Sequence, residues 1–279
     1  MEILFLGTAA AEGIPALFCR CETCLNAEKA GGRDIRSRCG FLVNRHLLLD
    51  ISMDIMLHKR LYNLDLSMLD TLCITHSHTD HLNWADLCFR SKWYACIPNA
   101  APLDVYANKK SCQVIRKGVE FEFHSQDQDF LEIHEIGRGS VIKSGELSIT
   151  AFNAKHDPTE NCLFYMIQER DKSFLQINDS GLPEEELEED LSKALKTRTL
   201  SAVSMDCTCG LEKGSTGHMG HGENITLKKR LLAAGVGDEK TQFFSTHFSH
   251  NGHGSHRELA EVLSPHNIVP AYDGMIVTL

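Results

Sequence analysis

The sequence feature that most constrains this chain is a histidine-rich stretch, Thr75-His76-Ser77-His78-Thr79-Asp80-His81. The residues before it, 71–75, form a short apolar and β-branched run that is typical of a buried strand. The residues after it, 82–92, are predicted to form a helix. The histidines therefore stand on a strand-to-helix turn, where several side chains can point toward one position.

The residue types in this stretch indicate a metal site. Imidazole and carboxylate groups are ligands that borderline divalent metals prefer. His76 and His78 project together from extended backbone, and Asp80 and His81 can address a second position one turn later, so two adjacent ions are expected. The alternative is a solvated histidine-rich turn without function. The complete H-x-H-x-D-H pattern at a strand end favours the metal site, and it resembles the hallmark of the metallo-β-lactamase superfamily.

Composition limits the classes of protein that this chain can belong to. The 279 residues are 42% hydrophobic, which is enough for one large domain or two small ones with a substantial core. A net charge of -10 argues against an extended nucleic-acid surface or an anionic-membrane surface. No apolar run approaches the roughly 20 residues of a membrane helix. The 11 cysteines are scattered and no export signal precedes them, so a disulfide framework is not expected and a cytoplasmic location is predicted.

Three cysteines near the N-terminus, Cys19, Cys21 and Cys24, form a C-x-C-x-x-C cluster. Thiolates at this spacing can fill three positions of a tetrahedral zinc ion, which leaves one ligand to come from elsewhere in the fold. The alternative is a group of reduced cysteines that pack as small apolar residues. Charged Arg20 and Glu22 lie between these thiols, which favours the metal site.

Predicted strands and helices first alternate along the chain and then give way to a run of strands, which suggests two sheets faced by helices in a single domain, residues 1–279. A helix over residues 53–61 is expected to bury its apolar stripe, including Met53, Met56 and Leu57. Residues 109–117 are predicted to be a helix and residues 119–124 a strand. Ser255 and Glu258 form a capping box at the start of the last helix.

Several further candidate ligands stand at predicted strand ends or in loops. His156 precedes Asp-Pro and is as easily a turn residue as a ligand. Asp179 lies on a glycine turn, where it could bridge two metals or simply form the turn. Asp50 closes a strand and either supports the site or is an ordinary strand-end residue.

Four motifs spread over almost the whole chain resemble the PhnP-type phosphodiesterases of phosphonate utilisation: Gly7-Thr8 with Gly13-Ile14-Pro15, the cysteine cluster, Asp179-Ser180-Gly181-Leu182-Pro183, and Thr246-His247-x-Ser249-His250. The resemblance implies a four-layer αββα sandwich of mixed α/β (α+β) class. It implies one metal on His76, His78 and His156, a second on Asp80, His81 and His247, and Asp179 as the bridge. It also implies His250 as the fourth ligand of a structural zinc. A loop histidine, His218 or His221, would act on the substrate, and His218 is favoured.

The resulting hypothesis is a hydrolase in which a hydroxide bridging two metals, Mn or Zn or Fe, attacks a small phosphodiester such as a cyclic ribosyl or nucleoside phosphate. Asp80 would be essential for this catalysis. The alternatives are a tRNA-processing endonuclease, a lactone or thioester hydrolase, and a noncatalytic metal-binding member of the superfamily. The expected partner is the small substrate, with no membrane partner, and the family suggests a homodimer.

Overall fold

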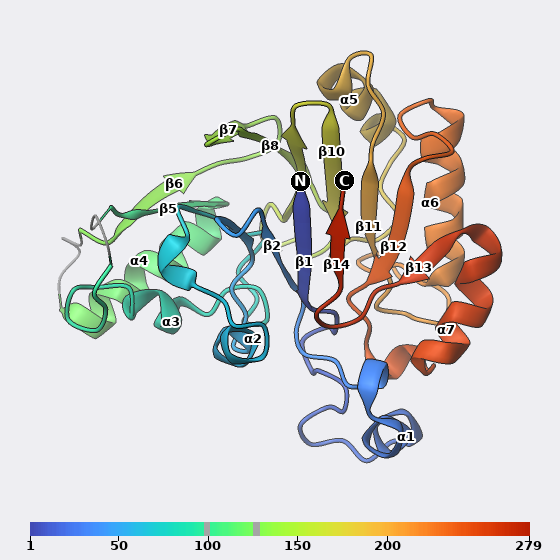
Figure 1. Ribbon diagram of the computed structural model, residues 1–279, viewed down its shortest axis with the longest axis horizontal. Helices are drawn as coiled ribbons and strands as arrows, with labels where there is room; N and C mark the ends of the chain where they lie inside the picture. The colour runs from blue at the N-terminus through green and yellow to red at the C-terminus, as the bar shows by residue number, and fades with distance from the viewer. Residues whose placement is uncertain (98–100, 125–128) are drawn as a thin grey trace.

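The computed structural model describes residues 1–97, 101–124 and 129–279, and two seven-stranded mixed sheets form its centre (Figure 1). In spatial order, the first sheet consists of β14 (Ile276–Thr278), β1 (Glu2–Gly7), β2 (Gly40–Val43), β3 (Leu47–Leu49), β4 (Thr71–Cys73), β5 (Leu103–Ala107) and β6 (Leu131–Glu135). The second sheet consists of β13 (Ile268–Pro270), β12 (Gln242–Thr246), β11 (Ala202–Asp206), β10 (Lys172–Ile177), β9 (Leu163–Glu169), β8 (Leu147–Asn153) and β7 (Val141–Ser144).

Helices cover the outer face of each sheet (Figure 1). The first sheet carries α2 (Ile55–Leu61), α3 (Trp84–Cys88) and α4 (Lys109–Phe123), and the second carries α5 (Glu186–Leu195), α6 (His221–Ala233) and α7 (His256–Leu263). Between the sheets lies an apolar core in which Phe5 contacts Phe41 and Phe244, and Phe41 contacts Phe174. The predicted four-layer αββα arrangement is confirmed.

The strand directions explain where the candidate ligands gather. Strands β3 to β6 run parallel to one another, as do β10 to β13. Because parallel strands end at the same edge of their sheet, the residues that follow them lie close together. Those residues include Asp50 after β3, the histidine-rich stretch after β4, Asp179 after β10 and His247 after β12.

Two predictions about local structure are wrong. Residues 119–124 do not form a strand, because α4 continues through Phe123. Their alternating Val-Glu-Phe-Glu-Phe pattern has the period of a strand, but Val119 is buried with Ile115 and Cys112 on one helical face. The buried face of α2 also differs from the prediction. Ile55 and His58 are buried there, whereas Met53 before the helix and Met56, Leu57 and Leu61 within it are exposed.

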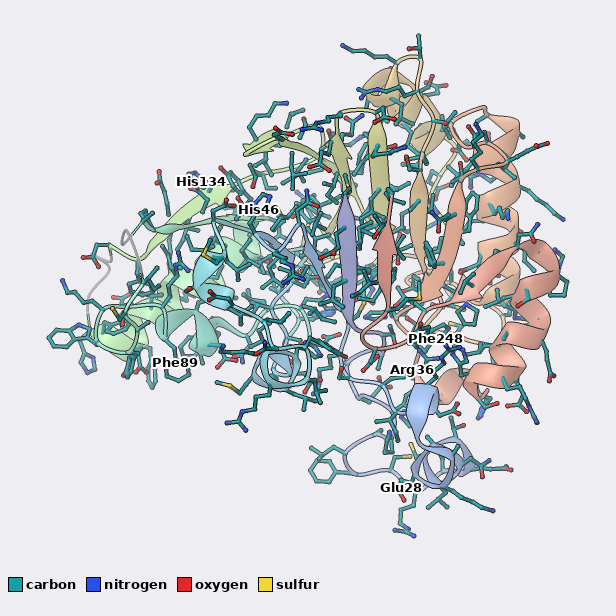
Figure 2. All side chains as sticks on the ribbon, viewed as in Figure 1. Glu28, Arg36, His46, Phe89, His134 and Phe248 are labelled. Atoms are coloured by element: carbon teal, nitrogen blue, oxygen red, sulfur yellow. The ribbon has the colours of Figure 1, made fainter. Side chains whose placement is uncertain are left out.

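Not every histidine contributes to the edge where the ligands gather. His46 lies in the turn between β2 and β3, and His134 lies on β6 (Figure 2); they approach the carboxylates of Asp70 and Asp104 at 3.2 and 2.8 Å. All eleven cysteines are free thiols. Within the described ranges, no helix has both the length and the apolar character needed to cross a membrane.

Candidate metal centre

The first group of candidate ligands consists of three histidines. His76, His78 and His156 each place one ring nitrogen within 4.8 Å of the others. His78 Nδ1 lies 3.2 Å from His156 Nε2. Burial lowers the pKa of His76 and of His156 below the ordinary range, so both imidazoles are neutral near pH 7. A neutral imidazole keeps a lone pair for a metal ion.

The second group consists of Asp80, His81, Asp179 and His247, all buried, with one donor atom each within 4.8 Å of the others. His81 Nε2 lies 3.0 Å from Asp80 Oδ2, 2.5 Å from Asp179 Oδ2 and 3.3 Å from His247 Nε2. Burial alone would raise the pKa of Asp179, but the imidazoles of His247 and His81 hold it well below its usual range. The carboxylate is therefore ionised and available to a cation.

Asp179 lies between the two groups. Its Oδ2 is 3.5 Å from His76 Nε2 in the first group and 2.5 Å from His81 Nε2 in the second. Two buried atoms at this point, His76 Nε2 and Asp179 Oδ1, have no hydrogen-bond partner among the residues that the structure describes. Buried polar atoms without partners are costly, and a bound cation would satisfy both. The donor set therefore fits divalent cations, and Asp179 lies where the two groups meet.

Further polar side chains orient two of these ligands. Asp50 Oδ2 lies 2.7 Å from His81 Nδ1, and the same carboxylate accepts hydrogen bonds from the backbone N–H and the hydroxyl of Thr75. Thr208 Oγ1 lies 2.8 Å from His247 Nδ1. The first contact occupies Nδ1 of His81 and leaves its Nε2 facing the cluster, whereas Nδ1 of His247 also lies 3.3 Å from Asp179 Oδ1. Fixing the outer nitrogen in this way is the usual means by which proteins orient histidine ligands.

Of the two loop histidines, the structure brings only His218 to the cluster. His218 Nδ1 lies 3.1 Å from Asp206 Oδ2 and 3.4 Å from Asp179 Oδ1. Burial opposes its protonation, but the carboxylate of Asp206 outweighs this and raises the pKa of His218 to about 9. His221 is the first residue of α6, and its Nδ1 lies 3.2 Å from the carbonyl oxygen of Gly210, outside the cluster.

Asp206, for which the sequence predicted no role, is fully buried at the end of β11. Its position at a strand end, like that of Asp179, was the available indication. Asp157 and Glu160 were also not singled out. They follow His156 in a turn and each offers a carboxylate oxygen that groups with His78 within 4.8 Å.

The cysteine cluster gathers with His250 as a separate candidate site. One donor atom from each of Cys19, Cys21, Cys24 and His250 lies within 4.8 Å of the others. His250 Nδ1 is 3.5 Å from Cys19 Sγ and 3.4 Å from Cys21 Sγ. A hydrogen bond from the Cys24 backbone lowers the pKa of the Cys21 thiol to about 6, whereas burial raises the pKa of Cys24 to about 11. Three sulfurs and one imidazole form a set that fits tetrahedral zinc.

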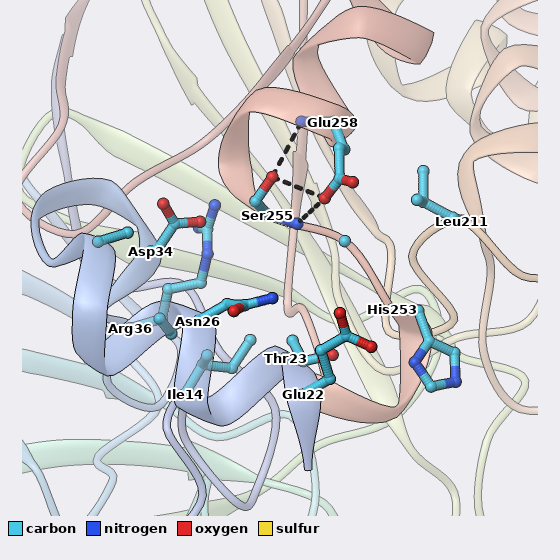
Figure 3. Close-up of a pocket in the computed structure, with 13 residues that line it drawn as sticks. Ile14, Glu22, Thr23, Asn26, Asp34, Arg36, Leu211, His253, Ser255 and Glu258 are labelled. Atoms are coloured by element: carbon cyan, nitrogen blue, oxygen red, sulfur yellow. Dashed lines mark hydrogen bonds between the residues drawn. The ribbon is translucent and has the colours of Figure 1, made fainter.

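A pocket of about 270 Å³ lies between α1 (Glu22–Ala30) and α7 (Figure 3), and the residues that line it include none of these candidate ligands. Two of its charged side chains, Glu258 and Arg36, already have protein partners. Glu258 closes the capping box with Ser255, and Arg36 donates to Thr8 Oγ1 and to the carbonyl oxygen of Ala271. We therefore place the functional site at the metal centre and not in this pocket.

Known proteins with similar sequences are only partly covered by this chain. An octanoyltransferase from Porphyromonas gingivalis is 24% identical over 283 residues, which cover 99% of this chain and 51% of that protein. A ribonuclease BN from Citrobacter koseri is 34% identical over 139 residues, which cover 48% of this chain and 43% of that protein. The chain thus spans about half the length, or less, of the curated relatives that it matches.

Solved structures share the whole fold at low identity. A diphosphatase of the PhnP family has a TM-score of 0.75 at 21% identity, and the match covers 100% of this chain and 97% of the diphosphatase chain. Zinc-bound PqqB from Methylobacterium extorquens has a TM-score of 0.75 at 20% identity, with 100% of both chains covered. The short form of human tRNase Z has a TM-score of 0.67 at 16% identity and covers 100% of this chain and 99% of its own.

A match to the family described as the β-lactamase superfamily domain extends over residues 45–236, which is more than half of the chain. These residues include the histidine-rich stretch, Asp179 and His218. The motif, the four-layer fold and this match agree, and we conclude that the chain belongs to the metallo-β-lactamase superfamily.

Proposed function

We propose that this protein is a metal-dependent hydrolase of a small phosphodiester, with a cyclic ribosyl or nucleoside phosphate as the substrate class. In this proposal His76, His78 and His156 hold one cation, Asp80, His81 and His247 hold the other, and Asp179 bridges them. Two divalent cations, whether Mn, Zn or Fe, would supply Lewis acidity and lower the pKa of an attacking water. The donor groups described above support this assignment.

The observation that carries the substrate class is the position of His218 beside the ligand cluster, with its Nδ1 3.4 Å from Asp179 Oδ1. Displacement at phosphorus develops negative charge on the phosphoryl oxygens and on the leaving alkoxide. A protonated His218 beside the ligand cluster can neutralise charge on the phosphoryl oxygens, or it can transfer its proton to the leaving alkoxide. Asp206 stabilises the imidazolium form, since its carboxylate lies 3.1 Å from His218 Nδ1.

Turnover on a small substrate panel tests this proposal. The panel holds a phosphodiester, a phosphomonoester, a lactone and a thioester, with protein reconstituted separately in Mn²⁺ and Zn²⁺. We expect phosphodiester cleavage that disappears in Asp80→Ala. Activity on the lactone or the thioester alone would overturn the substrate class, and full metal content with full turnover in Asp80→Ala would overturn the site.

Two matched histidine variants test the loop assignment. His218→Ala should lower kcat by about 10²- to 10⁴-fold, the usual contribution of a general acid. His221→Ala, the same substitution three residues later, should retain turnover because His221 faces Gly210. Wild-type turnover in His218→Ala would remove this residue from the mechanism.

The second candidate is a tRNA-processing endonuclease, which is supported by the similarity to a ribonuclease BN and by the fold shared with human tRNase Z. The net charge of -10 opposes it, because affinity for RNA depends strongly on basic phosphate contacts. Cleavage of a precursor tRNA, together with silence on the small-substrate panel, would favour this candidate. Silence in both assays would favour a noncatalytic metal-binding protein.

We also propose that Cys19, Cys21, Cys24 and His250 hold one structural zinc. The support is the donor set itself, three sulfurs and one imidazole within 4.8 Å; the Cys21 thiol has its pKa lowered to about 6, whereas burial raises the pKa of Cys24 to about 11. Thiolate is the form that binds zinc, so a low pKa favours binding at neutral pH.

A further inference from the structure

A turn that follows His156 packs against the exposed side of the three-histidine group. Asp157 Oδ2 in this turn lies 3.5 Å from His78 Nε2, the nitrogen that faces away from His156. Glu160 accepts hydrogen bonds from the backbone N–H of Ser77 at 3.1 Å and from its hydroxyl at 2.6 Å. Ser77 is the residue between the two ligand histidines His76 and His78.

The start of α4 holds the same two carboxylates from the other side. Asn108, the N-cap residue of α4, donates to Glu160 Oε2 at 2.7 Å and to the carbonyl oxygen of residue 161 at 3.0 Å. Lys110 Nζ lies 3.6 Å from Asp157 Oδ2 and 3.3 Å from Glu160 Oε1. The Glu160 side chain is only 1% exposed, so its charge is satisfied almost entirely by protein donors.

The three-histidine group needs such a support because its members come from separate segments. His76 and His78 follow β4, whereas His156 follows β8, and the side chain of His78 is 43% exposed. An exposed ligand on a turn loses conformational freedom when it binds a metal, and contacts that fix it beforehand reduce that cost. Carboxylates on the outer nitrogen of a ligand histidine also fix its tautomer.

We propose that Asp157 and Glu160 are positioning residues: Asp157 holds His78, and Glu160 holds Ser77 between His76 and His78, in the arrangement in which the three-histidine group binds one metal ion. We refer to Asp157, Glu160, Asn108 and Lys110 as the carboxylate clamp. The inference rests on the proposed function in one respect, namely that the three-histidine position binds a metal. The clamp acts on this position alone, since His81 and His247 are oriented by Asp50 and Thr208 instead.

Metal affinity tests the clamp without any substrate. Glu160→Gln and Asp157→Asn keep the shape of each side chain but remove its charge. Zinc affinity is measured by competition with a chromophoric chelator, and bound zinc is counted by elemental analysis. We expect one zinc position to weaken about 10- to 100-fold in each variant, the usual cost of losing an outer partner of a ligand. The other positions should stay filled.

Three further proteins make this result specific. Glu146→Gln removes a carboxylate that pairs with Arg170 on the surface, at 2.9 Å, and should leave every position unchanged. His78→Ala removes a ligand of the three-histidine position and should abolish zinc binding there, so it identifies which position the clamp variants weaken. Ser77→Ala removes the hydroxyl that donates a hydrogen bond to Glu160. In the double variant with Glu160→Gln, the loss of zinc affinity should be smaller than the sum of the two single losses.

The outcomes separate failure of the clamp from failure of the proposed function. If wild-type protein fills the three-histidine position and both clamp variants bind it equally well, the clamp is wrong. If both clamp variants lower the melting temperature and weaken every zinc position alike, their role is in general stability and the clamp is also wrong. If the three-histidine position is already empty in wild-type protein, so that His78→Ala removes no zinc, the proposed metal centre itself is wrong.

Discussion

At the scale of single residues, burial opposes protonation of the histidines around the candidate metal centre, but neighbouring carboxylates outweigh it at His81, His247 and His218 and raise their pKa. Burial lowers the pKa of His76 and His156, and no buried carboxylate other than Asp179 opposes it strongly there. His218 is also largely buried, yet the carboxylate of Asp206 at 3.1 Å raises its pKa to about 9. The same type of side chain is thus a neutral ligand candidate in one place and a cation in another.

Asp206→Asn should move the pH dependence of turnover. A pKa raised to about 9 means that His218 is protonated at pH 7 and loses its proton as the pH rises through that value. Activity that needs the proton therefore falls on the alkaline side. Removing the Asp206 charge should shift this alkaline limb down by about one to three pH units. The measurement is kcat against pH for both proteins, and coincident alkaline limbs would exclude Asp206 from this role.

At the scale of elements, α2 shows how a short helix can be placed by one polar contact. His58 on this helix is 1% exposed, and its Nε2 lies 2.7 Å from the hydroxyl of Ser37, which donates to Asp273. This network fixes which face of α2 turns inward. The apolar side chains of Met56 and Leu57 consequently face outward, against the expectation from their spacing.

His58→Gln should reduce the loss of stability in acid. Burial lowers the pKa of His58 to about 4. Below about pH 6.5 the unfolded chain therefore binds a proton at His58, whereas the folded chain does not until the pH approaches 4. Stability is therefore lost as the pH falls from 6.5 toward 4. Between pH 7 and 4.5 the free energy of unfolding of the wild type should drop by about 2 kcal/mol more than that of the variant.

Denaturant titrations at the two pH values measure this difference, and glutamine keeps an N–H that can reach Ser37. Other groups titrate equally in both proteins, so their contribution cancels in the comparison. An equal drop in the two proteins would show that His58 titrates in the folded protein as it does in the unfolded chain.

At the scale of the whole molecule, the cysteine site joins two distant parts of the chain. Cys19 and His250 are 231 residues apart in sequence, and their Sγ and Nδ1 atoms are 3.5 Å apart. A zinc ion there would fasten the loop before α1 to the segment that follows the candidate ligand His247. Metal binding at such a site contributes directly to the free energy of folding.

Cys21→Ser should lower zinc content by one ion per chain and depress the melting temperature. A loss of about 3 kcal/mol would lower Tm by roughly 6–12 °C in a chain of this size. The other metal positions and the turnover of the variant should stay largely intact. Elemental analysis and calorimetry measure the two effects, with Cys96→Ser, an exposed cysteine, as the control. Unchanged zinc content in Cys21→Ser would refute the site.

The class of fold and the residue types of the candidate site could be predicted from the amino-acid sequence alone. The histidine-rich stretch and the cysteine cluster are local, so their ligand spacing is visible without a structure, and the strand pattern was sufficient for two sheets faced by helices. The remaining candidate ligands could be assigned only from the resemblance of the motifs: His156, Asp179, His247 and His250. Their strands are far apart in sequence, and the order of strands in the sheets, which local patterns do not give, brings the strand ends together.

Tertiary contacts set which side chains face the ligand cluster. His218 and His221 are three residues apart, in the loop before α6 and at its first position, and their local sequence does not separate them. The direction of each side chain depends on distant contacts, with Asp206 for His218 and Gly210 for His221. The same holds for Glu160, whose donors come from Ser77 and Asn108. Burial and long-range packing set these orientations, and no periodicity in the sequence encodes them.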